Sequence, residues 1–201
     1  MRVSAKDGGG GGLRGLPPLD TPGARYLVLG SFPSALSLEK SEYYGHPRNQ
    51  FWSILATIAE TPTPPDWPSK VELAARLGVA IWDLVATCDR EGSLDADIRG
   101  AILNDVEGFV ASRASLGLVL LNGGAAAAFF ARRFAPGSGL DSSNFGDARA
   151  IVLGGKGLLA CRLPSTSPVP TRRFRTAADK LPFWRGAFLS LSPLPRLDKS
   201  G

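Results

Sequence analysis

The sequence of 201 residues holds only one histidine, two cysteines and one methionine. An iron–sulfur cluster or a four-thiolate zinc site needs more thiols than Cys88 and Cys161 provide, and His46 leaves little for a mixed site. We therefore expect no metal. We interpret both cysteines as reduced thiols with structural roles.

The sequence also lacks long apolar runs. No stretch has the roughly 20 consecutive apolar residues of a membrane span, and Met1–Lys6 runs into the glycines at 8–12 without the apolar segment of a secretory signal. Charged residues are scarce, at 20%, while hydrophobic residues make up 44%. This balance is typical of a globular domain with a sizeable core. We expect a soluble, cytoplasmic monomer that has no membrane partner.

The net charge of +5 and the isoelectric point near 9.6 favour an anionic partner such as nucleic acid, although many proteins with a mild positive excess bind none.

Residues 1–23 are rich in glycine, contain Pro17-Pro18 and have no periodicity, which is typical of a disordered segment. We therefore place one domain at residues 24–192 and a tail at 193–201.

Apolar runs alternate with polar loops and helical patterns along the domain. Strands are predicted at residues 26–29, 78–85, 116–121, 151–153 and 158–162, the last two around a turn at Gly154–Gly157. Helices are predicted at residues 49–59, 70–77, 125–133 and from 171 to about 182, and one further helical face comprises Ile98, Ile102, Val106, Phe109 and Val110. This order predicts an α/β fold with a central, mainly parallel four-stranded sheet and helices on both faces.

The loop after the first strand is the leading candidate for a functional site. It contains Gly30-Ser31-Phe32-Pro33-Ser34 and, further on, Tyr43-Tyr44-Gly45-His46-Pro47-Arg48-Asn49-Gln50-Phe51-Trp52. Ligands of open α/β sheets bind at the carboxyl ends of the strands, where this loop begins. Three more polar loops leave the same edge, at residues 88–95, 122–124 and 163–168. The glycines at 154–157 fit neither a P-loop nor a dinucleotide fingerprint, and a hairpin turn explains them better.

Four of these loops, taken in order, resemble the uracil-DNA glycosylase superfamily, and within it the hypoxanthine-DNA glycosylase branch. The resemblance covers about residues 25–190. It implies a three-layer α/β/α domain that flips a deaminated base out of DNA and hydrolyses its N-glycosidic bond, without a metal or organic cofactor. Phe32 stands where the superfamily usually has Asp or Asn. Ser167-Pro168-Val169-Pro170-Thr171 replaces the Ser-Pro-Ala-Asn-Ala of the branch.

The resemblance places the catalytic amide of the branch at Asn49. A carboxamide is no general base, so its role would be to position the attacking water and to stabilise charge as the bond breaks. The alternative is that Asn49 only caps the helix that follows.

Asn122 is the candidate reader of the base, because a carboxamide complements the N1–H donor and O6 acceptor of hypoxanthine. It could instead cap the next helix. Phe32 and Tyr44 could sandwich the base or simply pack in the core. Asp83 is interpreted as a residue that orients others.

The remaining candidates would contact the DNA backbone or its surroundings. They are His46, Arg48, Ser165, Ser167, Arg172 and Arg173. The arginines could equally be solvent-exposed residues at the start of a helix, with no contact to DNA. Because uracil presents the same donor–acceptor pair, a uracil or mismatch glycosylase is the nearest rival function, followed by an inactive DNA-binding domain and a small-molecule enzyme.

Overall fold

A five-stranded sheet forms the centre of the protein, whose computed structural model describes residues 12–90, 98–169 and 171–191. The strand order is β3-β2-β6-β8-β7. In that order the strands are Val79–Asp83, Tyr26–Gly30, Leu118–Asn122, Lys156–Leu163 and Ala148–Leu153. The first four are parallel, as predicted. The strand β7 adds a fifth, antiparallel strand through the predicted glycine hairpin.

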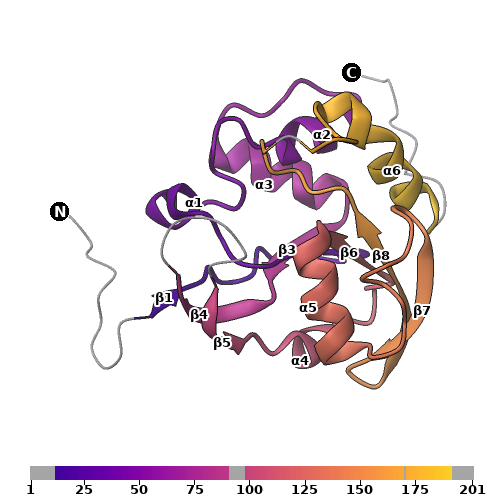
Figure 1. Ribbon diagram of the computed structural model, residues 1–201. Helices are drawn as coiled ribbons and strands as arrows, with labels where there is room; N and C mark the ends of the chain where they lie inside the picture. The colour runs from indigo at the N-terminus through magenta and orange to yellow at the C-terminus, as the bar shows by residue number, and fades with distance from the viewer. Residues whose placement is uncertain (1–11, 91–97, 170, 192–201) are drawn as a thin grey trace.

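Helices cover both faces of this sheet, which gives the three layers of the predicted fold (Figure 1). One face carries α2 (Phe51–Ile58), α3 (Trp67–Arg76) and α6 (Ala177–Leu189). The other face carries α4 (Val106–Ala111) and α5 (Gly124–Phe134), while the short α1 (Ala35–Lys40) lies in the loop between β2 and α2. No helix within the described ranges is long and apolar enough to cross a bilayer.

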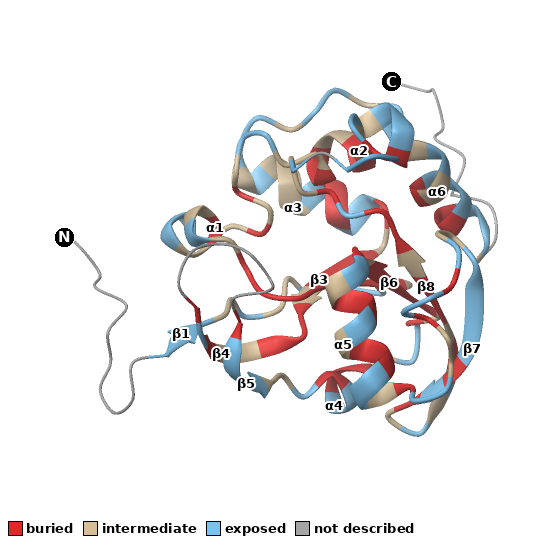
Figure 2. Cartoon of the chain, in the orientation of Figure 1, coloured by how far each residue is buried: buried red, intermediate tan, exposed pale blue. Residues whose placement is uncertain are grey.

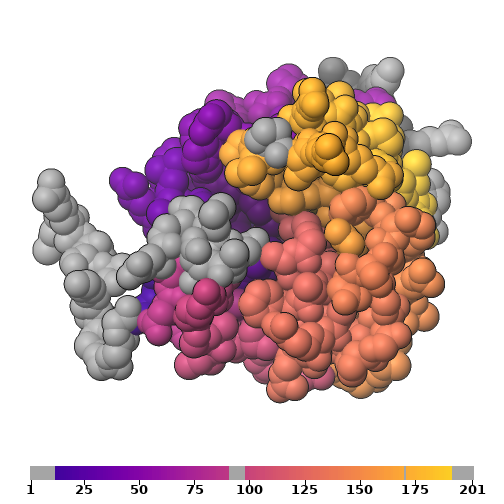
Figure 3. Space-filling view, viewed as in Figure 1, coloured from indigo at the N-terminus to yellow at the C-terminus, as the bar shows by residue number. Residues whose placement is uncertain are grey.

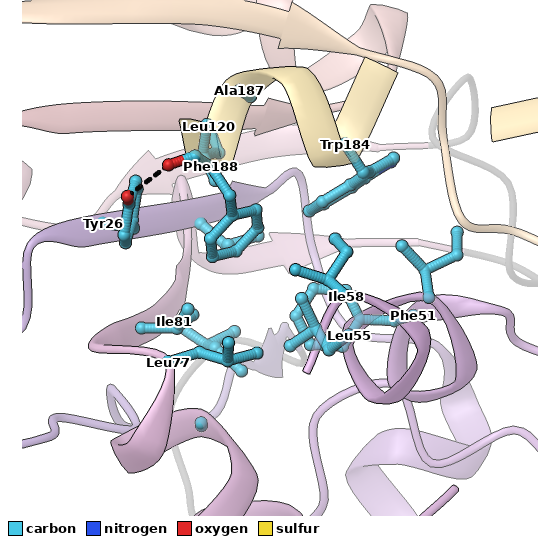
Figure 4. Packing of buried hydrophobic residues seen from close by; sticks show 14 of the residues in the cluster. Tyr26, Phe51, Leu55, Ile58, Leu77, Ile81, Leu120, Trp184, Ala187 and Phe188 are labelled. Carbon is cyan, nitrogen blue, oxygen red and sulfur yellow. Dashed lines mark hydrogen bonds between the residues drawn. The ribbon is translucent and has the colours of Figure 1, made fainter. Parts of the chain in front are cut away.

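The core is built from strands that are buried on both faces (Figure 2). In β2, Tyr26 and Val28 point into the cluster beneath α2, α3 and α6, whereas Leu27 and Leu29 point into the cluster beneath α4 and α5. The ring of Tyr26 packs against Phe188 of α6, and its hydroxyl donates to the Phe188 carbonyl at 2.7 Å (Figure 4). A strand packed on both faces needs continuous apolar residues, which is why this part of the sheet was predictable.

A second, three-stranded antiparallel sheet was not predicted. It consists of β1 (Leu13–Arg14), β4 (Val85–Asp89) and β5 (Arg99–Leu103). The predicted helical face from Ile98 is therefore wrong before Val106, and Ile102 is 65% exposed on β5. Its helix-like spacing is accidental, and pairing with β4 decides the structure. The predicted loop at 88–95 is wrong at its start, because β4 continues to Asp89; residues 91–95 lie outside the described ranges.

The segment from residue 12 to residue 23 belongs to the domain, which corrects the predicted boundary at residue 24. Leu19 pairs with Ile81 of β3. The Tyr43 hydroxyl donates to the carbonyls of Leu16 and Pro17. These long-range contacts hold the segment in place, although its sequence has no periodic pattern of apolar residues. The predicted disorder of residues 1–11 and the tail at 193–201 fall outside the described residues.

The last helix begins later and extends further than predicted. Thr176 caps α6 through a capping box with Asp179, so Arg172 and Arg173 precede the helix. The helix continues through Pro182 to Leu189. A proline inside a helix costs a hydrogen bond, and here the burial of Trp184 and Phe188 below it outweighs that loss.

Candidate active site

A pocket of about 480 Å³ opens at the carboxyl ends of β2, β3, β6 and β8. Segments from the two ends of the domain lie side by side on the surface around it (Figure 3). The pocket is lined by residues 30–37, Tyr43, Tyr44, His46, Arg48, Asn49, Asp83, Asn122 and residues 165–169. The predicted site residues at these positions are therefore brought together, although they come from four separate loops.

Asp83 and Gly30 form the base of the pocket at the ends of two neighbouring strands. Asp83 is 3% exposed. A Cβ atom on Gly30 would collide with the Asp83 carboxylate and would touch the Tyr44 hydroxyl, so only glycine fits there. Burial raises the pKa of Tyr43 beside them, and the charge of Asp83 adds to this effect. Asp83 thus contacts the groups around it, in keeping with an orienting role.

Both candidate aromatic residues line the pocket, and each also packs against another group. The Tyr44 ring stacks on Phe51 with a centroid distance of 4.0 Å, so only its other face is open to a ligand. Phe32 is 7% exposed and packs beside Cys88. The Arg90 guanidinium lies over the Phe32 ring at 4.8 Å from the centroid.

Asn49 combines features of both of its proposed roles. Its side-chain oxygen accepts a hydrogen bond from the Phe51 backbone N–H at 3.0 Å, which satisfies one free donor at the start of α2. Gln50 occupies the N-cap position and makes no side-chain cap of its own. No acceptor among the described residues takes a hydrogen bond from the Asn49 Nδ2 group. Asn49 therefore stabilises the helix start and still has an NH₂ group for a ligand or water.

Asn122 does not cap α5, so that alternative is wrong. The N-cap is Gly123, at φ +102°, and it makes no side-chain cap. Asn122 instead pairs with Thr166: its Nδ2 donates to the Thr166 hydroxyl and its Oδ1 accepts from the Thr166 N–H, both at 3.0 Å. An amide oxygen accepts two hydrogen bonds and an NH₂ group donates two. Asn122 therefore keeps one donor and one acceptor for a ligand.

Groups outside the loop at 163–169 donate three further hydrogen bonds to its backbone carbonyls. The Gln50 N–H donates to the Thr166 carbonyl at 2.9 Å, and Lys180 Nζ donates to the Ser167 carbonyl at 3.0 Å. The indole of Trp184 donates to the Pro164 carbonyl at 3.1 Å. Lys180 is 2% exposed, and burial lowers its pKa. Lys180 was not among the predicted site residues, although its position four residues before Trp184 places it on the buried face of the helix.

The candidates for backbone contacts fall into two groups. His46, Arg48, Ser165 and Ser167 line the pocket, and His46 Nδ1 accepts from the Arg48 N–H at 3.1 Å.

Arg172 and Arg173 are exposed and lie outside the lining. Arg173 lies over the rings of Phe145, Phe174 and Phe183. Over residues 12–90, 98–169 and 171–191 no group of three His, Cys, Asp or Glu side chains could hold a metal ion.

The family sequence model described as Uracil DNA glycosylase superfamily matches residues 17–187 of the chain. The chain belongs to the uracil DNA glycosylase superfamily. Two relatives named Hypoxanthine DNA glycosylase, from Methanosarcina barkeri and Methanosarcina acetivorans, are 33% and 32% identical to it over 111 residues, or 55% of this chain and 70% of theirs. The solution structure of a Methanosarcina acetivorans protein that carries the provisional name uracil DNA glycosylase superimposes with a TM-score of 0.67. It is 26% identical, and the match covers 90% of this chain and 98% of that one.

Proposed function

We propose that this member of the superfamily removes a deaminated base from DNA by hydrolysis, with hypoxanthine as its main substrate. One observation carries the proposal: two carboxamides, from Asn49 and Asn122, and two aromatic rings, from Phe32 and Tyr44, line one pocket at the carboxyl edge of the sheet. Its volume of about 480 Å³ lies within the range of small-molecule sites.

A base inside a duplex is inaccessible, so the nucleotide must rotate out of the stack into the pocket. Phe32 and the open face of Tyr44 then provide apolar surfaces for the base. The remaining donor and acceptor of Asn122 match O6 and N1–H of hypoxanthine. Because Thr166 fixes both ends of the carboxamide, the amide is already oriented when the base arrives, and a fixed group loses less entropy on binding.

Asn49 acts on the reaction centre. The C1′–N9 bond breaks with its electron pair on the base, a water oxygen forms the new bond to C1′, and a proton from that water ends on the base. The oxygen of Asn49 already accepts from Phe51, whereas its NH₂ group makes no hydrogen bond within the described residues, so the NH₂ group is the part most available to hold the water oxygen in line. The described lining carries no amine, which favours water over an enzyme amine as the attacking group, and hence a monofunctional glycosylase.

Uracil is the second candidate base, because its O4 and N3–H present the same pair of groups to Asn122. The names of the two Methanosarcina relatives favour hypoxanthine. The name of the protein with the similar solution structure favours uracil.

The test uses duplexes that carry one deoxyinosine or one deoxyuridine. Excess enzyme is incubated with each duplex, abasic sites are cleaved with alkali, and single-turnover rates are compared. We expect excision of deoxyinosine, at a higher rate than deoxyuridine. Tight duplex binding without excision of either base would favour an inactive DNA-binding domain and would overturn the proposal.

A further inference from the structure

Arg90, the residue that follows β4, carries a buried charge. It is 9% exposed. No carboxylate within the described ranges pairs with it, since the two ion pairs there are Lys70–Glu42 and Arg113–Asp20. Its Nε is buried and has no hydrogen-bond partner. A buried charge is costly unless nearby groups compensate for the lost water, so the contacts that Arg90 makes are informative.

The described side-chain contacts of Arg90 lead to one wall of the pocket. Its guanidinium lies over the Phe32 ring at 4.8 Å from the centroid, and a terminal N–H donates to the Pro33 carbonyl at 2.7 Å. Phe32 and Pro33 both line the pocket, whereas Arg90 does not. The arginine thus supports this wall from the side that faces away from the pocket.

We propose that Arg90 is a positioning residue for base excision, which fixes Phe32 and places a positive charge behind the surface on which the base lies. This inference rests on the proposed function, because it assigns a role to the departing base. When the C1′–N9 bond breaks, its electron pair moves onto the base, which becomes negative before a proton from the attacking water neutralises it. A fixed cation in a poorly hydrated site stabilises that charge, even without direct contact.

The ring between the two charges helps this effect. A cation over one face of an aromatic ring attracts its π-electrons, so the opposite face repels an anion less than a free ring does. A guanidinium is planar and stacks on the ring, while lysine concentrates its charge at one point and cannot stack in the same way.

The test compares two substrates that differ in how well the base accepts negative charge. They are duplexes with deoxyinosine and with 8-aza-deoxyinosine, in which a nitrogen replaces C8–H and makes the base a better leaving anion. The edge that Asn122 would read is the same in both. Single-turnover rates at saturating enzyme are measured for the wild type, Arg90→Gln and Arg90→Lys.

We expect Arg90→Gln to lower the excision of deoxyinosine by about tenfold to a hundredfold, and Arg90→Lys to lower it less. The loss for Arg90→Gln should be several times smaller with the 8-aza base, which needs less stabilisation. Arg132→Gln, which removes an exposed arginine from the Phe129 ring on α5, serves as the matched control and should change neither rate.

The outcomes separate this inference from the proposed function. A wild type that excises deoxyinosine, together with an Arg90→Gln loss equal for both bases, would overturn the electrostatic role and leave the proposed function intact. A wild type inactive on deoxyinosine would overturn both. Circular dichroism checks the fold, and if Arg90→Gln unfolds, Arg90→Met fills the same buried site without a charge and should show the same dependence on the base.

Discussion

Residues 30–50 form one wall of the pocket and residues 163–169 the other, and different kinds of contacts hold the two walls in place. In the first wall, the aromatic side chains are supported by other side chains, Tyr44 by Phe51 and Phe32 by Arg90, which also donates to the Pro33 carbonyl. In the second, side chains from elsewhere hold the backbone, as Lys180 holds the Ser167 carbonyl and Trp184 the Pro164 carbonyl.

This difference suggests that the first wall positions the base and that the second wall contacts the DNA backbone. Groups that must meet the base at a set distance and angle need fixed side chains, which the first wall has. A loop that contacts phosphates needs a fixed backbone and exposed hydroxyls, which the second wall has at Ser165 and Ser167. Substitutions in the first wall should then alter the excision rate. Substitutions of the side chains that hold the second wall should alter DNA affinity.

The largest effect is expected for Asn49→Ala in the first wall. Loss of one preorganised group at a reaction centre typically costs about 10² to 10³ in rate. Duplex affinity should change little, because Asn49 is not assigned to a phosphate. Single-turnover excision and equilibrium binding of the deoxyinosine duplex measure the two quantities.

The helix contact of Asn49 calls for a matched control. Asn49→Ala also removes the acceptor for the Phe51 N–H, which costs about 1 kcal/mol of stability. Asn49→Asp keeps that acceptor but replaces the NH₂ group with oxygen. It should fold normally and still be inactive. An active Asn49→Asp enzyme would show that the NH₂ group is not required, because the new carboxylate can itself accept a proton from the water.

Asn122, which is paired with Thr166 of the second wall, should show the next largest effect. Asp at this position keeps the acceptor for the Thr166 N–H, and the Thr166 hydroxyl can rotate to donate to it. The loop should therefore stay in place. The new oxygen would face O6 of hypoxanthine, and a buried mismatch of this kind costs roughly 1 to 3 kcal/mol, so Asn122→Asp should lose about tenfold to a hundredfold on deoxyinosine.

Thr166→Val provides the contrast, because it breaks the pairing and leaves the Asn122 carboxamide intact. We expect it to reduce the rates on deoxyinosine and deoxyuridine by similar factors, since it loosens the amide without changing its chemistry. Single-turnover rates on both duplexes compare the two variants, and Thr166→Val should lose less than Asn122→Asp because it places no second acceptor opposite O6 or O4. Undiminished excision by a folded Asn122→Asp variant would confine Asn122 to holding the loop.

A smaller effect is expected from Lys180→Met, which acts behind the second wall. Losing the hydrogen bond to the Ser167 carbonyl should weaken duplex affinity by about threefold to tenfold and leave the rate at saturating enzyme unchanged. Lys70→Met, on α3, removes one positive charge without touching the loop and is the control. Equal losses of affinity in the two variants would indicate a general charge effect.

The same residue predicts a dependence on pH. Burial lowers the pKa of Lys180 below its usual 10.5, so the unfolded chain binds this proton more tightly than the folded one. The ammonium therefore costs stability at low pH, and the cost is relieved as pH rises through the lowered pKa. Relative to Lys180→Met, the wild type should gain free energy of unfolding between that pKa and 10.5. Denaturant unfolding of both proteins at several alkaline pH values measures this.

The parts of the molecule that sequence analysis anticipated are those set by local pattern. The parallel strands are continuous apolar runs, and their loops must meet at one edge of the sheet. The pairing of Asn122 with Thr166 joins residues 44 positions apart, and the contact of Arg90 with Pro33 joins residues 57 apart. Local sequence patterns do not predict contacts between residues this far apart in the chain. The strand β5 was missed because Ile98, Ile102 and Val106 are spaced like one face of a helix, whereas pairing with β4 makes residues 99–103 a strand.

The smallest effect is expected at the outer edge of the second wall, from replacing Arg172 and Arg173 with Ala. Both are exposed and lie outside the pocket, so the excision rate at saturating enzyme should not change. Each phosphate contact that is lost should reduce the slope of log affinity against log salt concentration by about one. Arg132→Ala with Arg133→Ala, in the last turn of α5 and so at the end away from the pocket, removes the same charge and should leave the slope as it is. If both pairs lower the slope equally, the arginines before α6 contribute only general charge, and the grip on phosphate must come from the hydroxyls and backbone of residues 165–169.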